Sequence, residues 1–353
     1  MQPKKQLENS CFKRSEPATQ LTVRRAFKIV ATITLANALS ACGSPESATI
    51  EGRPSGPYRM TFEAHPANPA PQQKTLLTER ITLRRGGTPV QGLQVLHERV
   101  IHNFIVNLDF TSFAHIHHED FAPIGRADLD NATLQFPYSF PTRGRYRIVS
   151  EFTHRNRSWT KHFDIAVGDP ADEPNVQVDL TREISRGRYR ASLSVSPPIP
   201  VAGFETELVL ELARDDQPVT DLELILGSEA HVALWRTDGS QFGHTHSYTP
   251  HMAAMMSRMH DRTIDPQTRA KAMTEMMIGM SNMPSELVFE GPHVPLRFVF
   301  AEPGTYAVFI QCAPGGTAEV FNFMLEVEAY REGMTTDIDP WVSPNAHHDQ
   351  AHL

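Results

Sequence analysis

Six histidines fall into two groups with identical spacing. The pattern H-x6-D-x3-F-x-H-x-H occurs twice, 129 residues apart, and its histidines are His102, His115 and His117 in the first copy and His231, His244 and His246 in the second. Imidazole nitrogen is a ligand for both copper and zinc, and histidines two positions apart on a strand lie on the same face. The pattern therefore predicts a three-nitrogen metal site in each half of the chain.

The repeat also has an explanation that involves no metal. A duplicated domain would carry the same histidines at its rim, or hydrogen-bonded within a packed loop, and recognition of another ligand is a further alternative. His97, Glu98, His118 and Glu119 flank the first copy only. We treat these four residues as secondary candidates, because the second copy has no strict counterpart.

A β-hairpin is the element that brings the three histidines of each copy together. Residues 109–112 and 238–241 are good turn sequences, since an Asp side chain can hydrogen-bond the backbone two residues on. A four-residue loop would place Leu108 opposite Phe113 and His102 diagonal to His117 on one face. A loop longer by one residue would move His102 to the opposite face.

Further parallels extend the repeat over most of the chain. Each copy consists of short alternating segments separated by Pro, Gly and Asp, which is typical of a β-sandwich of immunoglobulin-like size. We expect an all-β fold with two tandem sandwiches, at residues 58–168 and 188–328, joined by a linker at 169–187. The offset between the copies rises from about 130 to 160 after His246. The second copy therefore contains an insertion of about 31 residues.

The insertion is rich in methionine. Residues 251–284 hold nine of the 13 methionines, at spacings of three and four that predict two helices with a turn at Asp265-Pro266. Thioether sulfur favours Cu(I), so this segment contributes secondary metal candidates: His251, Met252, Met255, Met256, Met259 and His260. The alternative is that methionine fills the seam between the two helices and the sandwich.

The N-terminal segment predicts export. Arg24, Arg25 and Lys28 precede the apolar run 29–39, which is too short to cross a bilayer, and residues 39–42 read Leu-Ser-Ala-Cys. This tetrapeptide resembles the lipobox of bacterial lipoproteins, which implies a signal peptide at residues 1–41, a lipid on Cys42 and a tether over 42–57. The expected location is the cell envelope, with the membrane as a partner and the outer membrane favoured where two membranes are present.

Charge and cysteine usage narrow the function classes. The net charge is −8, and the acidic excess grows to about 13 without residues 1–41, which argues against nucleic acid as a partner.

Cys312 is the cysteine left after removal of the signal and lipidation of Cys42. Its counterpart in the first copy is Phe152, so we expect a buried thiol, although contact of Cys312 or Gln311 with the second histidine group stays open. The tail 329–353 contains His347, His348 and His352, which predict a solvated end or a loose chelator.

The repeated motif, followed by Gly-x-Tyr before a strand, resembles a group of exported bacterial proteins with tandem immunoglobulin-like domains. These are distantly similar to periplasmic copper-binding β-sandwich proteins. The resemblance covers residues 58–328 and implies a role in metal homeostasis. The common form has Pro after the His-x-His pair, where this chain has His118 and Ser247.

We therefore expect a membrane-anchored, exported metal-binding protein that binds, buffers or delivers copper, with zinc as the alternative ion. The sequence leaves open whether a metal-handling protein is a partner. The second hypothesis is a structural or adhesive lipoprotein that docks a protein partner through its methionine-rich insertion. We do not expect an enzyme, and a mononuclear copper oxidase is a minor alternative.

Overall fold

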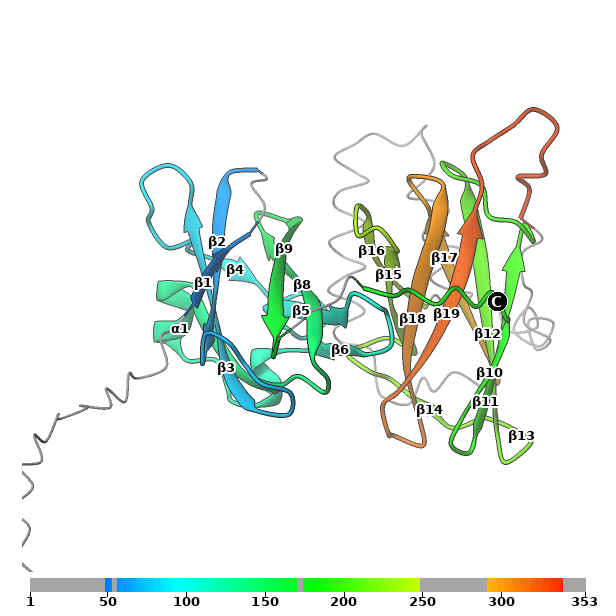
Figure 1. Ribbon diagram of the computed structural model, residues 1–353, viewed down its shortest axis with the longest axis horizontal. Helices are drawn as coiled ribbons and strands as arrows, with labels where there is room; N and C mark the ends of the chain where they lie inside the picture. The colour runs from blue at the N-terminus through cyan, green and yellow to red at the C-terminus, as the bar shows by residue number, and fades with distance from the viewer. Residues whose placement is uncertain (1–47, 53–55, 170–173, 248–290, 339–353) are drawn as a thin grey trace, which may run out of the picture. The chain divides into compact units, whose positions relative to one another are not determined.

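The computed structural model describes residues 48–52, 56–169, 174–247 and 291–338. These residues form antiparallel sheets almost throughout (Figure 1). No helix of the described residues is both long and apolar enough to cross a membrane. The predicted signal peptide, Cys42, the methionine-rich insertion and the histidines of the tail lie outside the described residues.

The first sandwich consists of two sheets. One has the strand order β1 (Ala48–Glu51), β2 (Tyr58–His65), β3 (Lys74–Leu83) and β7 (Thr133–Ser139). The other has the order β4 (Leu93–Gln94), β8 (Gly144–His154), β5 (Ile101–Asn107) and β6 (Phe113–Ile116), and β9 (Arg157–Val167) also pairs with β8. The buried residues of both sheets form one core, in which Phe62, Phe136, Ile148 and Phe163 are fully enclosed.

The second sandwich repeats this arrangement. Its first sheet has the order β10 (Glu183–Arg186), β11 (Tyr189–Ser196), β12 (Glu205–Arg214) and β13 (Gln217–Pro218), and β17 (His293–Val299) pairs with β12. Its second sheet has the order β14 (Leu222–Glu223), β18 (Gly304–Pro314), β15 (Ala230–Arg236) and β16 (Phe242–His246), and β19 (Glu319–Val327) pairs with β18. The predicted all-β fold with tandem sandwiches is confirmed.

Four short elements differ from the expectation. Residues 48–51 form strand β1 on the edge of β2, and residues 183–186 form β10 on the edge of β11, where a tether and a linker were expected. A single helical turn η1 (His118–Asp120) and a short helix α1 (Arg126–Asn131) lie between β6 and β7. The segment that leads into each sandwich thus adds an edge strand, in which backbone N–H and C=O groups pair with those of the neighbouring strand.

Strand β5 shows how the two sandwiches are joined. Every one of its residues is buried, whereas the alternation of a strand normally buries one face. Ile101 and Ile105 face the core of the first sandwich, and Phe104 and Val106 belong to a separate cluster that includes Trp235 of β15. The same face of each sandwich therefore packs against the other, which makes the interface isologous within one chain.

The hairpins that carry the histidines have a different loop length from the predicted one. Val106, and not Leu108, pairs with Phe113, so six residues separate the two members of this pair, and Trp235 pairs with Phe242 in the second copy. The register is thus shifted by two residues from the four-residue loop. Because side chains alternate with a period of two, this shift keeps all three histidines on one face.

The predicted turn chemistry holds in both copies. Asp109 Oδ1 accepts a hydrogen bond from the Thr111 backbone N–H at 3.2 Å, and Asp238 Oδ1 accepts one from Ser240 at 2.9 Å. The residue between them is left-handed in both hairpins, with φ of 60° at Phe110 and 70° at Gly239. The two loops therefore have one conformation despite different residues at this position.

A buried polar group lies in the core beneath the first histidine face. Glu79 of β3 is 1% exposed, and its Oε2 accepts a hydrogen bond from Asn103 Nδ2 at 3.1 Å. The Ser150 hydroxyl has one hydrogen but lies 2.6 Å from Glu79 Oε1 and 2.7 Å from Asn103 Oδ1. A protonated Glu79 closes this ring, because its own hydroxyl donates to Ser150 while Ser150 donates to Asn103.

The pKa of Glu79 agrees with this arrangement. Burial raises it to about 7, against the opposing hydrogen bonds from Ser150 and Asn103, and the nearby charge of Glu119 raises it further. In the folded chain Glu79 therefore holds a proton that the unfolded chain releases above pH 4.5. The stabilisation is complete below pH 4.5 and is lost as the pH rises through 7, by about 3 kcal/mol in total.

Glu79→Gln should remove this dependence, because a neutral amide donates to Ser150 and accepts from Asn103 as the protonated acid does. Urea unfolding at pH 5 and pH 8 should show that the variant is more stable than the wild type at pH 8 and similar at pH 5. The control is Glu63→Gln, which changes a half-buried residue of the neighbouring strand β2. An unchanged pH dependence in Glu79→Gln would contradict the protonated ring.

Candidate metal centre

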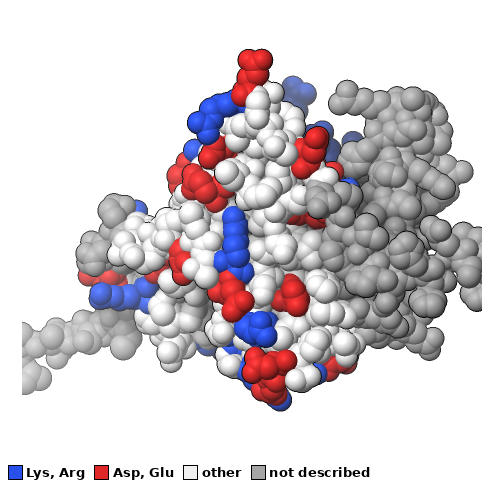
Figure 2. Space-filling view, turned by 90° about the vertical axis from the view of Figure 1, so that its right-hand side faces the viewer, with Lys and Arg blue, Asp and Glu red and all other residues white. Residues whose placement is uncertain are grey.

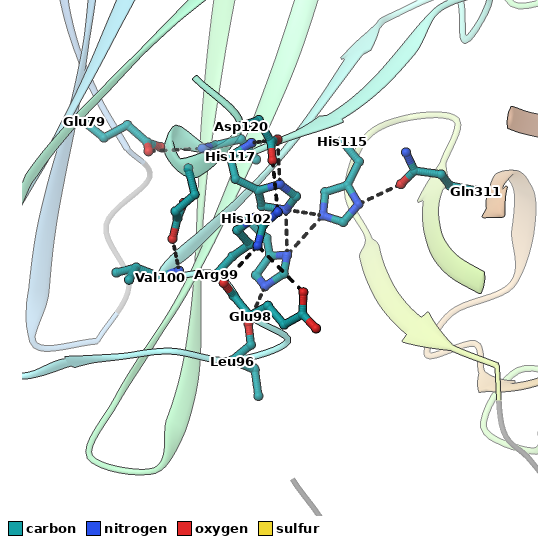
Figure 3. Close-up of polar contacts among 12 residues, drawn as sticks. Glu79, Leu96, Glu98, Arg99, Val100, His102, His115, His117, Asp120 and Gln311 are labelled. Atoms are coloured by element: carbon teal, nitrogen blue, oxygen red, sulfur yellow. Dashed lines mark hydrogen bonds and ion pairs between the residues drawn. The ribbon is translucent and has the colours of Figure 1, made fainter. Parts of the chain in front are cut away.

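Three ring nitrogens of the first histidine group converge. His102 lies on β5, His115 on β6 and His117 directly after β6, and the three rings point toward one another (Figure 3). His102 Nδ1 is 3.1 Å from His115 Nε2 and 3.1 Å from His117 Nε2, and the last two atoms are 3.0 Å apart. The side chains are almost completely buried, at 2%, 8% and 3% exposure.

The other nitrogen of each ring has a fixed partner. His102 Nε2 donates to the Leu96 carbonyl at 2.9 Å, His115 Nδ1 to Gln311 Oε1 at 3.0 Å, and His117 Nδ1 to Asp120 Oδ2 at 2.9 Å. All three acceptors are oxygens, so each outer nitrogen carries a hydrogen. When the three rings are neutral, their inner nitrogens present only lone pairs to one another. They cannot satisfy each other by hydrogen bonding, and a cation among them would.

The second group repeats two of the three outer contacts of the first. His231 Nε2 donates to the Ile225 carbonyl at 2.7 Å, at the position of Leu96, and His244 Nδ1 donates to Glu151 Oε2 at 3.0 Å. One ring nitrogen from each of His231, His244 and His246 lies within 4.8 Å of the others. His231 Nδ1, His244 Nε2 and His246 Nε2 are buried and have no hydrogen-bond partner among the described residues.

The two groups lie against each other at the interface between the sandwiches. The ring of His115 is centred 5.4 Å from that of His231, and the ring of His102 is 5.9 Å from that of His244. His244 also packs on Phe104, at 4.6 Å between ring centres. The six candidate ligands predicted from the sequence are thus brought together as two clusters in one buried region.

Electrostatics keeps four of these rings neutral. Burial is the largest cause that lowers the pKa of His102, His115, His231 and His246 well below 6.5, and the charges of neighbouring histidines lower it further. Neutral imidazole is the form that binds a metal ion. Two carboxylates lie in contact with the clusters, Asp120 at the first and Glu151 at the second. The arrangement can therefore offer each ion three ring nitrogens and one nearby carboxylate.

His97 of the first sandwich lies against the second cluster. Its ring is centred 4.0 Å from that of His246 and 6.0 Å from that of His231. It lies at the tip of the tight turn whose Leu96 carbonyl holds His102, and its φ is 47°. Burial lowers the pKa of His97 to about 4, with a smaller effect from the charge of His244. The repeat pattern ranked this residue second because Leu226 occupies the same place in the other copy.

The remaining flanking candidates do not join the clusters. His118 Nδ1 contacts the backbone of Gln135, Glu119 accepts the Val100 N–H at 2.9 Å, and Glu98 lies beside Arg99. Gln311, whose contact with the second cluster the sequence left open, bonds through its side chain to His115 of the first cluster. Sequence reasoning also missed Glu151, although its position beside His102 on β8 corresponds to that of Gln311 beside His231 on β18.

Cys312 has the buried environment that its phenylalanine counterpart predicted. It is a free cysteine with 0% exposure in the core of the second sandwich. Burial raises its pKa from 9 to about 12, with a smaller contribution from Glu319. A thiol with this pKa is protonated at neutral pH and is a poor metal ligand.

The surface around the second sandwich carries charges of both signs. On the face shown in Figure 2, Lys and Arg side chains are interspersed with Asp and Glu. Arg188 pairs with Asp215, and Arg214 Nη2 lies 2.6 Å from Asp221 Oδ2. Mixed charge of this kind suits solubility and gives no basic stripe for a nucleic-acid backbone on this face.

The comparisons with known proteins agree with the architecture. Two antiparallel β-sandwiches of immunoglobulin or fibronectin type III size define the fold class. The family model of a domain of unknown function, DUF8832, matches residues 55–169 and 183–329. This is more than half of the chain, and the chain belongs to that family. No curated protein sequence matches it.

Similar solved structures share little sequence with the chain. The two-domain fibronectin type III segment of chicken tenascin is 9% identical, with a TM-score of 0.19, and the match covers 78% of this chain and 99% of that one. Alpha-2-macroglobulin of Escherichia coli is 10% identical, with a TM-score of 0.22, covering 79% and 23%. The titin domains Z1Z2 in complex with telethonin are 12% identical, with a TM-score of 0.17, covering 77% and 98%.

The Cys312 thiol should be unreactive in the folded chain. A rise in pKa from 9 to about 12 reduces the thiolate fraction about 1,000-fold at neutral pH, and burial excludes the reagent as well. With Cys11 and Cys42 replaced by serine, labelling by a thiol-specific disulfide reagent should occur only after unfolding in guanidinium. Labelling of the folded chain at the rate of the unfolded one would contradict the buried placement.

Proposed function

We propose that the protein binds two metal ions per chain, one at each three-histidine cluster, with copper favoured and zinc as the alternative. The observation that carries this proposal is the convergence of His102 Nδ1, His115 Nε2 and His117 Nε2 while their outer nitrogens donate elsewhere. Fixed outer partners orient imidazole ligands toward a metal ion and increase their basicity. The repetition of the same atoms in the second cluster supports the same role there.

The dimensions of the first cluster fit such an ion. Donor atoms that surround an ion tetrahedrally at bonds of ~2.0 Å lie about 3.3 Å from one another. The measured separations of 3.0–3.1 Å differ from this by a few tenths of an ångström. An ion therefore requires small ring movements and no rearrangement of the hairpin.

The ligand type narrows the choice of ion. An all-imidazole set suits copper and zinc, and disfavours magnesium and calcium, which prefer oxygen. Copper is favoured because residues 251–284, which begin five positions after His246, hold nine methionines, and thioether binds Cu(I). The burial of the clusters suits retention of the ion, and we assign the role to binding, buffering or delivery of metal.

The location is part of the same proposal. Residues 39–42, after a basic segment and a short apolar run, support export and lipid attachment at Cys42, which would place metal binding in the cell envelope. Cys42→Ser should abolish incorporation of a labelled fatty acid and release the chain from the membrane fraction. Retention of the label in Cys42→Ser would contradict the anchor.

Metal content tests the proposal directly. After exposure to excess copper or zinc and dialysis, elemental analysis of residues 43–353 should give one ion for each of the two clusters. His244→Ala with His246→Ala should lower this by one ion. Free metal at 100 times Kd should also stabilise the fold by about 2.7 kcal/mol for each site, seen as a higher Tm.

The matched control is His65→Ala, because His65 on β2 is exposed and belongs to neither cluster. This variant should keep both ions. The proposal fails if the wild type takes up neither metal, or if the cluster variant holds as much metal as His65→Ala does.

A further inference from the structure

The outer partners of the two clusters cross the interface in a reciprocal way. His115 of the first sandwich donates to Gln311 of the second at 3.0 Å, and His244 of the second donates to Glu151 of the first at 3.0 Å. His115 and His244 occupy the same position of the repeat, as do Gln311 and Glu151. Each sandwich therefore supplies an orienting group to the cluster of the other.

We infer that the two clusters form a single two-ion centre, in which Glu151 and Gln311 are positioning residues that act across the sandwich interface. The inference rests on the proposed metal binding and adds that neither site is complete within its own sandwich. Figure 3 shows Gln311 reaching His115 from a strand of the other sandwich.

The strand geometry explains why these two residues reach across. Glu151 pairs with His102 in the register of β8 and β5, and Gln311 pairs with His231 in the register of β18 and β15. Each therefore lies beside a ligand of its own sandwich and on the same face. When the two faces pack, the side chain meets the diagonal histidine of the opposite hairpin, which would otherwise have no orienting partner.

The two positions differ chemically, and this makes the sites unequal. Glu151 Oε2 lies 3.0 Å from His244 Nδ1 in an ion-pair contact, so the second cluster has a carboxylate as its partner. Gln311 offers a neutral amide oxygen. A carboxylate increases the basicity of the imidazole more than an amide does, so the second site gains more from its partner than the first.

Interface packing supports a shared centre. Phe104, Val149, Trp235 and Phe309 are at most 2% exposed and hold the two faces together around the histidines. His97 adds a further contact from the first sandwich to the second cluster. A substitution on the interface face of one sandwich thus affects the histidines of the other sandwich and leaves both sandwich cores intact.

Exchange of amide and carboxylate provides the test. Zinc affinity of the full chain is measured against a chromophoric chelator in two backgrounds that each retain the cross-interface pairs. His231→Ala with His246→Ala leaves the first site, and His102→Ala with His117→Ala leaves the second. A chain with all four substitutions defines background binding by other histidines and methionines.

In the first background, Gln311→Ala should weaken zinc binding by roughly tenfold, and Gln311→Glu should strengthen it above the Gln311 level. In the second, Glu151→Ala should weaken binding by roughly tenfold and Glu151→Gln by a smaller factor. The control is Gln217→Ala, on the exposed strand β13. It should change neither affinity.

A purely structural role predicts a different pattern. Loosening of the interface would lower both affinities together, and a carboxylate at 311 would not raise the first. Nitrogen-15 spectra add a second readout, because Gln311→Ala should change the tautomer of His115 in the metal-free chain. If the wild type binds two ions while Gln311→Ala leaves the first affinity within twofold, the inference is overturned. If the wild type binds no more than the four-substitution chain, the proposed function itself fails.

Discussion

Electrostatic repulsion among imidazole lone pairs is the constraint on which the rest of the structure depends. Bringing three acceptor nitrogens within 3.0–3.1 Å is unfavourable unless a cation lies among them. The backbone carbonyl of Leu96, the carboxylate of Asp120 and the amide of Gln311 prevent the rings from turning away. The hairpin, the tight turn before it and the opposite sandwich each contribute one of these restraints.

Duplication of one domain supplied both the histidines and the surface that buries them. The two faces are alike, so their packing places equivalent groups opposite one another, as in a twofold dimer. Phe104 and Trp235 show the result, since both lie in the shared cluster and are excluded from solvent. Burial then lowers the pKa of His102, His115, His231 and His246 and favours their neutral form. The packing of the two faces therefore both forms the interface and buries the imidazoles that a cation would bind.

Differences between the copies break this symmetry. Glu151 stands where the other copy has Gln311, and His97 stands where the other has Leu226. Both changes place additional titratable groups of the first sandwich at the second cluster. The second cluster is also the one followed by the methionine-rich insertion. The chain thus combines two similar histidine clusters in unequal surroundings.

The sequence predicted the sandwiches and the six histidines because spacing alone carries that information. Short alternating segments predicted the β fold. Equal spacing in both copies predicted that the three histidines of each copy lie on one face. This holds even though Val106, and not Leu108, pairs with Phe113. A register shift of two residues leaves every side chain on the same face, so the sequence pattern does not reveal it.

The packing of one sandwich against the other could not be predicted, because no local sequence pattern shows which faces of the two sandwiches contact each other. Glu151 was therefore missed, and the contact of Gln311 with a histidine of the first half was not foreseen. The edge strand at residues 48–51 was missed for a similar reason, as its pairing with β2 is a tertiary contact. His97 was ranked only as a secondary candidate, because the repeat gives Leu226 at its position.

Anomalous X-ray diffraction from crystals grown with copper or zinc would test the central claim most directly. The account predicts one metal peak in each cluster, bound at ~2.0 Å by Nδ1 of His102 or His231 and by Nε2 of the other two histidines. Peaks at other positions, or histidine clusters filled by ordered water in the presence of excess metal, would contradict it.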